Sequence, residues 1–132
     1  MKLTDLIAAL EDAYVMLSRG AAGTLDMTPV FPEREIPPAL VAEARRYKPK
    51  LLDYLAWVEE ADHALLLSTH RIAAHYPVGC DALDTDATWD AFEAELRGAY
   101  ARQDRALLTE VILRRESYAM GVFDAWTRER QA

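Results

Sequence analysis

Three histidines, His63, His70 and His75, have side chains that could support metal chemistry. Imidazole nitrogens bind zinc, and Glu59 with His63 has the four-residue spacing that places two side chains on one edge of a helix. His70 and His75 are five residues apart, so they do not share a helix face well, and the sequence has no HExxH motif. We therefore expect no metal site. A small metal-dependent enzyme that uses these histidines is the third of three functional hypotheses.

The acidic segment 81–95 has the ligand spacing of a calcium-binding loop. Oxygen-bearing side chains stand at positions 1, 3, 5, 7 and 12 of such a loop, namely Asp84, Asp86, Thr88, Asp90 and Glu95. The sixth position requires glycine for a sharp turn, and Trp89 stands there instead. Helix capping therefore explains these residues better than calcium binding. The sequence also has no glycine-rich phosphate-binding motif, so we predict no catalytic residues, no cofactor and a protein that is not an enzyme.

Charge narrows the choice of partner. The net charge of −7 argues against direct nucleic-acid binding, because Lys and Arg supply most of the affinity for phosphate. The basic residues Arg45, Arg46, Lys48 and Lys50 nevertheless fall within six positions. Such a cluster is either a solvated face or a docking surface for an acidic partner.

The acidic segment 81–95 supports the second functional hypothesis. This is an acidic inhibitor or accessory protein of a phage or mobile element. It would be a nucleic-acid mimic that occupies a basic channel, or a replication-associated protein.

Composition predicts a cytoplasmic protein. The longest apolar run is far shorter than a membrane span, and the start, MKLTDLIAALEDAY, carries acidic residues and no small-residue cleavage site. Cys80 has no second cysteine with which to form a disulfide or a zinc site. We therefore expect no membrane partner.

Hydrophobic spacing predicts an α+β, mostly helical fold. We expect a small αββαα module with a β-hairpin, in which the fifth element is a long helix, followed by two further C-terminal helices. The elements are a first helix capped by Thr4, strands 14–17 and 24–28, helices 38–46 and 49–76, and two final helices capped by Thr88 and Asp104. Residues 1–60 would form the module and 61–132 a helical extension packed on it, or both would form one continuous domain.

The expected helix 49–76 is longer than a small module needs. At about 1.5 Å per residue it spans roughly 40 Å, and apolar residues continue along it. Exposed apolar surface of this kind marks an interface, so we expect a homodimer. Trp57 lies off the main apolar stripe of this helix, and we assign it to the partner-binding set as an anchor for the C-terminal helices or for a second subunit.

The first 56 residues resemble a known family. The hairpin YVMLSRGAAGTLDMTP and the segment PPALVAEARRYKPKLLDYL, with its basic residues followed by Leu51, Leu52 and Leu55, are similar to N-terminal docking domains of the TubC type, found in tubulysin synthetase and its relatives. These domains are αββαα dimers that bind a short acidic segment of a partner, and similar modules occur in small proteins of mobile elements. The chain departs from the pattern in its long insert VFPEREIP, and we expect no condensation or carrier domain among the residues that follow.

The resemblance implies a docking surface on the hairpin and the neighbouring helix. Its residues would be Tyr14, Met16, Leu17, Arg45, Arg46 and Lys48. An exposed strand edge offers backbone hydrogen bonds to an incoming segment, and nearby cations select for acidic side chains. The favoured hypothesis is therefore a non-catalytic docking or adaptor module that dimerises and binds a protein partner through an acidic linear segment. The alternative is that a second copy or the C-terminal helices cover the hairpin edge and that the cations are merely solvated.

Overall fold

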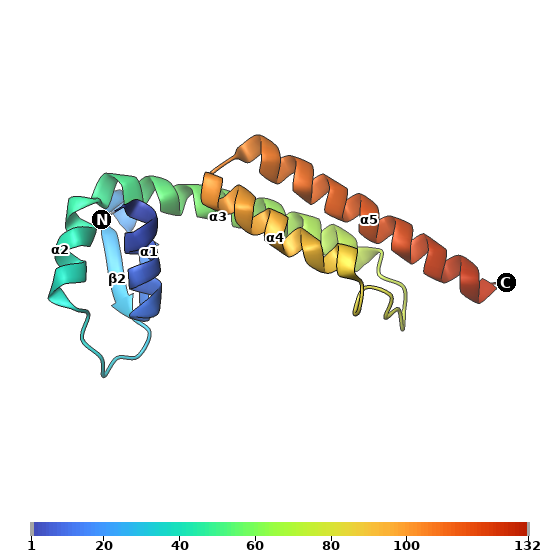
Figure 1. Cartoon of the computed structure of the whole chain (residues 1–132), viewed down its shortest axis with the longest axis horizontal. Coiled ribbons are helices and arrows are strands. Elements are labelled where there is room, and N and C mark those ends of the chain that lie inside the picture. The colour runs from blue at the N-terminus through green and yellow to red at the C-terminus, as the bar shows by residue number, and fades with distance from the viewer. Residues whose placement is uncertain (1, 132) are drawn as a thin grey trace. The chain divides into compact units, whose positions relative to one another are not determined.

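The computed structural model describes residues 2–131 and is mostly helical, with one antiparallel hairpin. Its elements are α1 (Leu3–Asp12), β1 (Val15–Arg19), the short 3-10 helix η1 (Ala21–Gly23), β2 (Leu25–Pro29), α2 (Pro38–Arg46), α3 (Lys48–Ala74), α4 (Ala87–Arg102) and α5 (Arg105–Gln131) (Figure 1). This confirms the predicted α+β, mostly helical fold and its order, an αββαα module followed by two helices. No helix among the described residues is apolar over a stretch long enough to cross a membrane.

The chain divides into two compact units within α3. The N-terminal unit extends to Trp57, and the C-terminal unit begins at Val58. Each unit has a core cluster of its own.

The core of the N-terminal unit lies between the helices and one face of the hairpin. Its fully buried members are Leu6, Leu10, Val15, Ala44 and Leu51. They come from α1, β1, α2 and the first turn of α3, so one cluster fixes four elements. Leu17 and Met27, which lie opposite each other on the two strands, add half-buried side chains to this cluster.

The hairpin alternates between a packed face and an open face. Val15 pairs with Pro29 and Leu17 with Met27, so these residues face the core, whereas Met16 and Thr28 face outward. At the turn the Gly20 N–H donates to the Thr24 carbonyl at 2.8 Å. A Cβ at position 20 would clash with the Thr24 side chain unless that side chain moved, so glycine fits this tight turn best.

Two details at the start of the N-terminal unit differ from the sequence prediction. α1 begins at Leu3, so Thr4 is inside the helix and does not cap it. Instead Asp5 Oδ2 accepts a hydrogen bond from the Lys2 backbone N–H at 3.3 Å. β1 begins at Val15, because Tyr14 adopts the left-handed conformation, with φ of 56°, that turns the chain out of α1.

The C-terminal unit contains the remainder of α3 together with α4 and α5. α4 runs back along α3, and α5 runs parallel to α3 (Figure 1). The core cluster at one end of these helices consists of Ile72, Cys80, Leu83, Ala119 and Phe123. Cys80, the free cysteine, is a buried member of this cluster. Across the helices the Tyr100 hydroxyl donates to Asp62 Oδ1 at 2.8 Å, which ties α4 to α3.

Of the two caps predicted for the last two helices, one is correct and one is wrong. Asp104 caps α5 as expected, because its Oδ1 accepts from the Leu107 N–H at 2.9 Å. α4 is capped by Asp86 and not by Thr88. Asp86 accepts from the Trp89 N–H at 2.8 Å through Oδ1 and from the Tyr118 hydroxyl at 2.6 Å through Oδ2. The cap of α4 is thereby also a contact with α5.

We expect Asp86 to make the stability of the C-terminal unit depend on pH. Hydrogen bonds from the Tyr118 hydroxyl and the Trp89 N–H lower the pKa of Asp86 below its ordinary value of 3.8. A carboxylate with a lowered pKa stabilises the fold above the unfolded-state pKa, and this contribution is lost as the pH falls through the folded-state pKa. Asp86→Asn should therefore lower the melting temperature at neutral pH and flatten its decline below about pH 4. Thermal melts over a pH series would test this, with the exposed Asp124→Asn as the control that should melt like the unchanged protein.

Candidate functional site

Four large apolar side chains gather in the N-terminal unit at the end of the hairpin where β1 begins. Tyr14, Met16, Val30 and Phe31 are 50, 60, 51 and 39% exposed. The rings of Tyr14 and Phe31 meet edge to face, with centroids 5.2 Å apart. We call these four residues the hairpin-end patch.

The backbone and Arg34 hold the hairpin-end patch in place. The Tyr14 N–H donates to the Glu11 carbonyl at 2.9 Å, and the Tyr14 carbonyl accepts from the Val30 N–H at 2.8 Å. The guanidinium of Arg34 lies 5.2 Å from the centroid of the Phe31 ring and 5.8 Å from that of Tyr14. Such contacts between a cation and aromatic faces are attractive. Backbone hydrogen bonds thus fix the main chain at Tyr14 and Val30, and Arg34 contacts both exposed rings.

Sequence reasoning missed half of this patch. Val30 and Phe31 open the insert VFPEREIP, which also supplies Arg34 and which the TubC-type pattern does not contain. The signal that could have identified them is a pair of large apolar residues directly after a strand and before Pro32. Such residues come after the last position of β2 that packs on the core, and their side chains stay exposed.

Leu17 and Trp57, both assigned to the partner-binding set from sequence, are not exposed. Leu17 lies on the packed face of the hairpin, half-buried against the N-terminal core, because it is one residue away from the outward-facing Met16. Trp57 is only 7% exposed. Leu17 therefore does not belong to the docking surface. Trp57 offers no exposed side chain to a second subunit, and its role as an anchor for the C-terminal helices stays a prediction.

The predicted cations form a second surface. Arg45, Arg46, Lys48 and Lys50 are all exposed, around the junction of α2 and α3. We call these four residues the basic cluster. Its only ion pair among the described residues is a 3.9 Å contact from Arg46 to Glu43. Arg46 and Lys50 lie 5.9 and 5.7 Å from the centroid of the Tyr47 ring, and a shallow hollow is lined by Arg46, Tyr47, Pro49 and Lys50.

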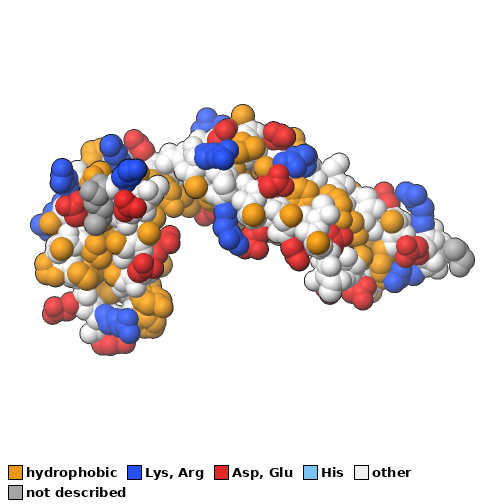
Figure 2. All heavy atoms as spheres, in the orientation of Figure 1, with side chains coloured by type: hydrophobic (Ala, Val, Ile, Leu, Met, Phe, Trp, Pro, Cys, Tyr) orange, Lys and Arg blue, Asp and Glu red, His pale blue; other side chains and the backbone are white. Residues whose placement is uncertain are grey.

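The hairpin-end patch and the basic cluster lie at opposite ends of the N-terminal unit. α2 runs antiparallel to β2, so its C-terminal end, which carries Arg45 and Arg46, lies beside the hairpin turn (Figure 1). Tyr14 and Phe31 lie at the other end of the strands. Figure 2 shows basic side chains over the C-terminal end of α2 and apolar side chains toward the far end of the unit. The residues expected to form one docking surface therefore form two surfaces, which are separated by the length of the hairpin.

The acidic segment 81–95 is partly neutralised within the chain. Glu95 accepts from Arg114 at 2.7 Å, and Glu93 pairs with Arg97 at 2.9 Å. Asp86 is engaged in capping α4. The segment is therefore not a uniform face of free carboxylates.

The histidines lie on α3 or directly after it and are exposed. His63 and His70 are on the open side of α3, and His75 Nδ1 lies 2.9 Å from the carbonyl oxygen of Arg71. Within residues 2–131 no three His, Cys, Asp or Glu side chains are grouped so that they could hold a metal ion. The described residues thus offer no ligand set for the metal-enzyme hypothesis.

Comparison with protein-family models, with curated proteins and with solved structures finds no match for this chain.

Proposed function

We propose that the N-terminal unit is a non-catalytic docking module that binds a protein partner through the hairpin-end patch. The observation that carries this proposal is the exposure of Tyr14, Met16, Val30 and Phe31 together at one end of the hairpin. Apolar residues gathered on a surface mark interaction sites more often than single exposed ones do. Tyr, Phe, Met and Arg are also the residue types enriched at the centre of protein interfaces.

The hairpin offers backbone groups to the same partner. Among residues 2–131 the sheet has two strands, so each strand has one edge that pairs with no other described strand. Two pairs across the hairpin are hydrogen-bonded, namely Tyr14 with Val30 and Gly20 with Thr24. In an antiparallel ladder, hydrogen-bonded pairs alternate with pairs that are not. The N–H and C=O groups of Val15 and Leu17 therefore point away from β2. An extended segment can add to such an edge as a further strand.

The basic cluster indicates the chemistry of the partner. At about 3.3 Å per residue, an extended segment of roughly six residues covers the length of this hairpin. A segment with an apolar side chain at one end and acidic side chains at the other would reach the hairpin-end patch and the basic cluster together. The proposed partner therefore carries a short linear segment that combines an apolar anchor with acidic residues.

Removal of the apolar side chains should abolish docking without unfolding the chain. We expect Met16→Ser combined with Phe31→Ser to weaken binding by about 2 kcal/mol or more, as for anchor residues at the centre of an interface. The partner would first be captured from lysate with the full chain, and its affinity then measured by calorimetry. Val78→Ser, at a loop position that is 98% exposed and outside the N-terminal unit, is the matched control. Unchanged affinity of the double variant would refute the proposal.

A further inference from the structure

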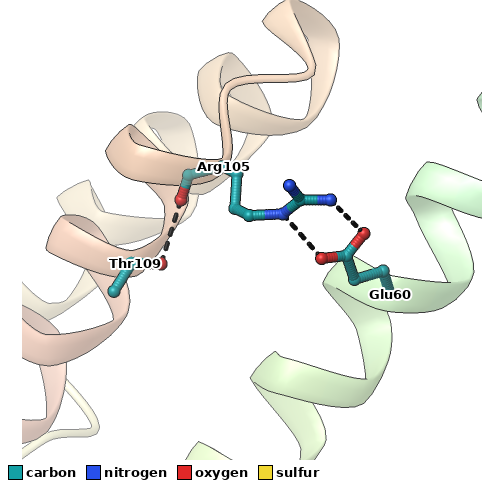
Figure 3. A network of polar contacts seen from close by, with 3 residues as sticks. All are labelled: Glu60, Arg105 and Thr109. Atoms are coloured by element: carbon teal, nitrogen blue, oxygen red, sulfur yellow. Dashed lines mark hydrogen bonds and ion pairs between the residues drawn. The ribbon is translucent and has the colours of Figure 1, made fainter.

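Two ion pairs join α3 to α5 in the C-terminal unit. Glu60 accepts two hydrogen bonds from Arg105, at 2.6 and 2.7 Å (Figure 3), and Arg71 donates to Glu116 at 2.8 Å. The partners in each pair are 45 positions apart in the sequence. α3 and α5 therefore run parallel in a fixed register, in which a residue of α3 is level with the residue 45 positions later on α5.

Between these ion pairs lie exposed leucines. Leu67 follows Glu60 by seven residues and precedes Arg71 by four, so it lies on the same side of α3 as both. Leu113 precedes Glu116 by three residues, so it lies on the side of α5 that carries Glu116. The register sets Leu67 level with Ile112, the residue directly before Leu113. Leu67 and Leu113 are 46 and 55% exposed, and the neighbouring Leu66 is 52% exposed. We call Leu67, Leu113 and the two ion pairs the seam patch.

The charges of the seam patch alternate around its apolar centre. Along α3 a negative charge at Glu60 is followed by a positive one at Arg71. Along α5 the order is reversed, from Arg105 to Glu116. Two such patches can be brought face to face by a two-fold rotation whose axis lies either along the helices or across them. In both cases every acidic side chain lies opposite a basic one. The pattern is therefore complementary to itself.

We propose that the seam patch binds the seam patch of a second copy of this chain, so that the protein is a two-fold symmetric dimer. A symmetric interface must be self-complementary, and this surface is. An apolar centre within a polar, charged rim is also the usual arrangement of a protein interface. In this dimer the leucines supply the affinity, because exposed ion pairs contribute little. The charges favour the two-fold arrangements over pairings that set like charges opposite each other. This proposal needs no docking partner and can fail while the docking proposal holds.

The mass of the full chain in solution tests the apolar centre. Light scattering from about 1 μM to about 1 mM, the range of moderate to weak association, should show the protein approach twice the chain mass of 14.9 kDa. Leu67→Glu combined with Leu113→Glu should hold the mass at that of one chain. Val78→Glu, which adds the same type of charge at a 98% exposed position off the seam, should leave the dimer intact. A wild-type chain that stays monomeric throughout, or a double variant that still dimerises, overturns the proposal.

A charge exchange tests whether the charged side chains lie in the interface, and it guards against a misfolded variant. Glu60→Lys with Glu116→Lys leaves four positive charges on the patch, and Arg71→Glu with Arg105→Glu leaves four negative ones. Each variant alone should be monomeric, because like charges then face each other in either two-fold arrangement. An equimolar mixture of the two should recover the dimer mass. If each variant dimerises alone, or if the mixture stays monomeric while both circular dichroism spectra remain helical, the seam patch is not the interface. If either variant loses helicity, the light-scattering result for Leu67→Glu combined with Leu113→Glu decides the proposal.

Discussion

Replacing Leu6 with alanine should unfold the N-terminal unit while the C-terminal unit remains folded. Leu6 is fully buried in the cluster that joins α1, β1, α2 and α3. Truncation of a buried leucine to alanine costs about 2–5 kcal/mol. At roughly 0.05–0.15 kcal/mol per residue, a unit of about 57 residues has only about 3–9 kcal/mol of stability. The substitution therefore removes much or all of what holds this unit together.

Amide NMR spectra of the full chain would resolve this outcome by residue. Signals from residues up to Trp57 should lose dispersion, and signals from α4 and α5 should keep theirs. Leu66→Ala, at a leucine that is 52% exposed, is the control and should change stability by no more than about 0.5 kcal/mol. Simultaneous loss of all dispersed signals in Leu6→Ala would show that the two units fold as one.

Reversal of the basic cluster should slow association with the partner by about 10- to 1000-fold, the range attributed to electrostatic steering. The variant combines Arg45→Glu, Arg46→Glu and Lys48→Glu. Stability should hardly change, because exposed charge pairs contribute only about 0–1 kcal/mol each. Added salt should slow the unchanged protein in the same way, since the Debye length is about 8 Å at physiological ionic strength.

The control for this reversal must carry the same net charge. Arg97→Glu, Arg102→Glu and Arg128→Glu together change three exposed arginines of the C-terminal unit by the same amount. Association rates by stopped-flow mixing at low and high salt would separate local steering from the effect of total charge. Equal rates for the two triple variants would mean that the basic cluster is merely solvated.

The order of the elements follows from short-range signals that the sequence carries openly. Pro38 and Pro49 stand in the first turn of a helix, where a missing N–H costs nothing, and apolar residues recur at helical spacing through α3, α4 and α5. These short-range signals determine the ends of the helices less clearly. Asp86 and Thr88 are both good capping residues two positions apart, and the hydrogen bond from Tyr118 on α5 helps to hold Asp86 in the cap. That choice depends on tertiary structure, which local spacing does not contain.

The site could be predicted only in part, for similar reasons. The exposure of Arg45, Arg46 and Lys48 follows from charge alone. The separation of these cations from Tyr14 depends on the direction of α2 relative to β2, which no local pattern encodes. The resemblance places Leu17 on the surface with Met16, whereas strand alternation places neighbours on opposite faces. The left-handed conformation of Tyr14 accompanies a local hydrogen bond from its N–H to the Glu11 carbonyl at the end of α1. The insert after Pro29 begins with the hydrogen bond between Val30 and Tyr14 across the hairpin, which local spacing does not contain.

An NMR titration of the isotope-labelled full chain with the acidic segment of its captured partner tests the docking proposal most directly. Chemical-shift changes should concentrate at the hairpin-end patch, along the free edge of β1 and at the basic cluster, and they should be lost in Met16→Ser combined with Phe31→Ser. Shift changes confined to the C-terminal unit, with the hairpin signals unmoved at saturation, would contradict the account.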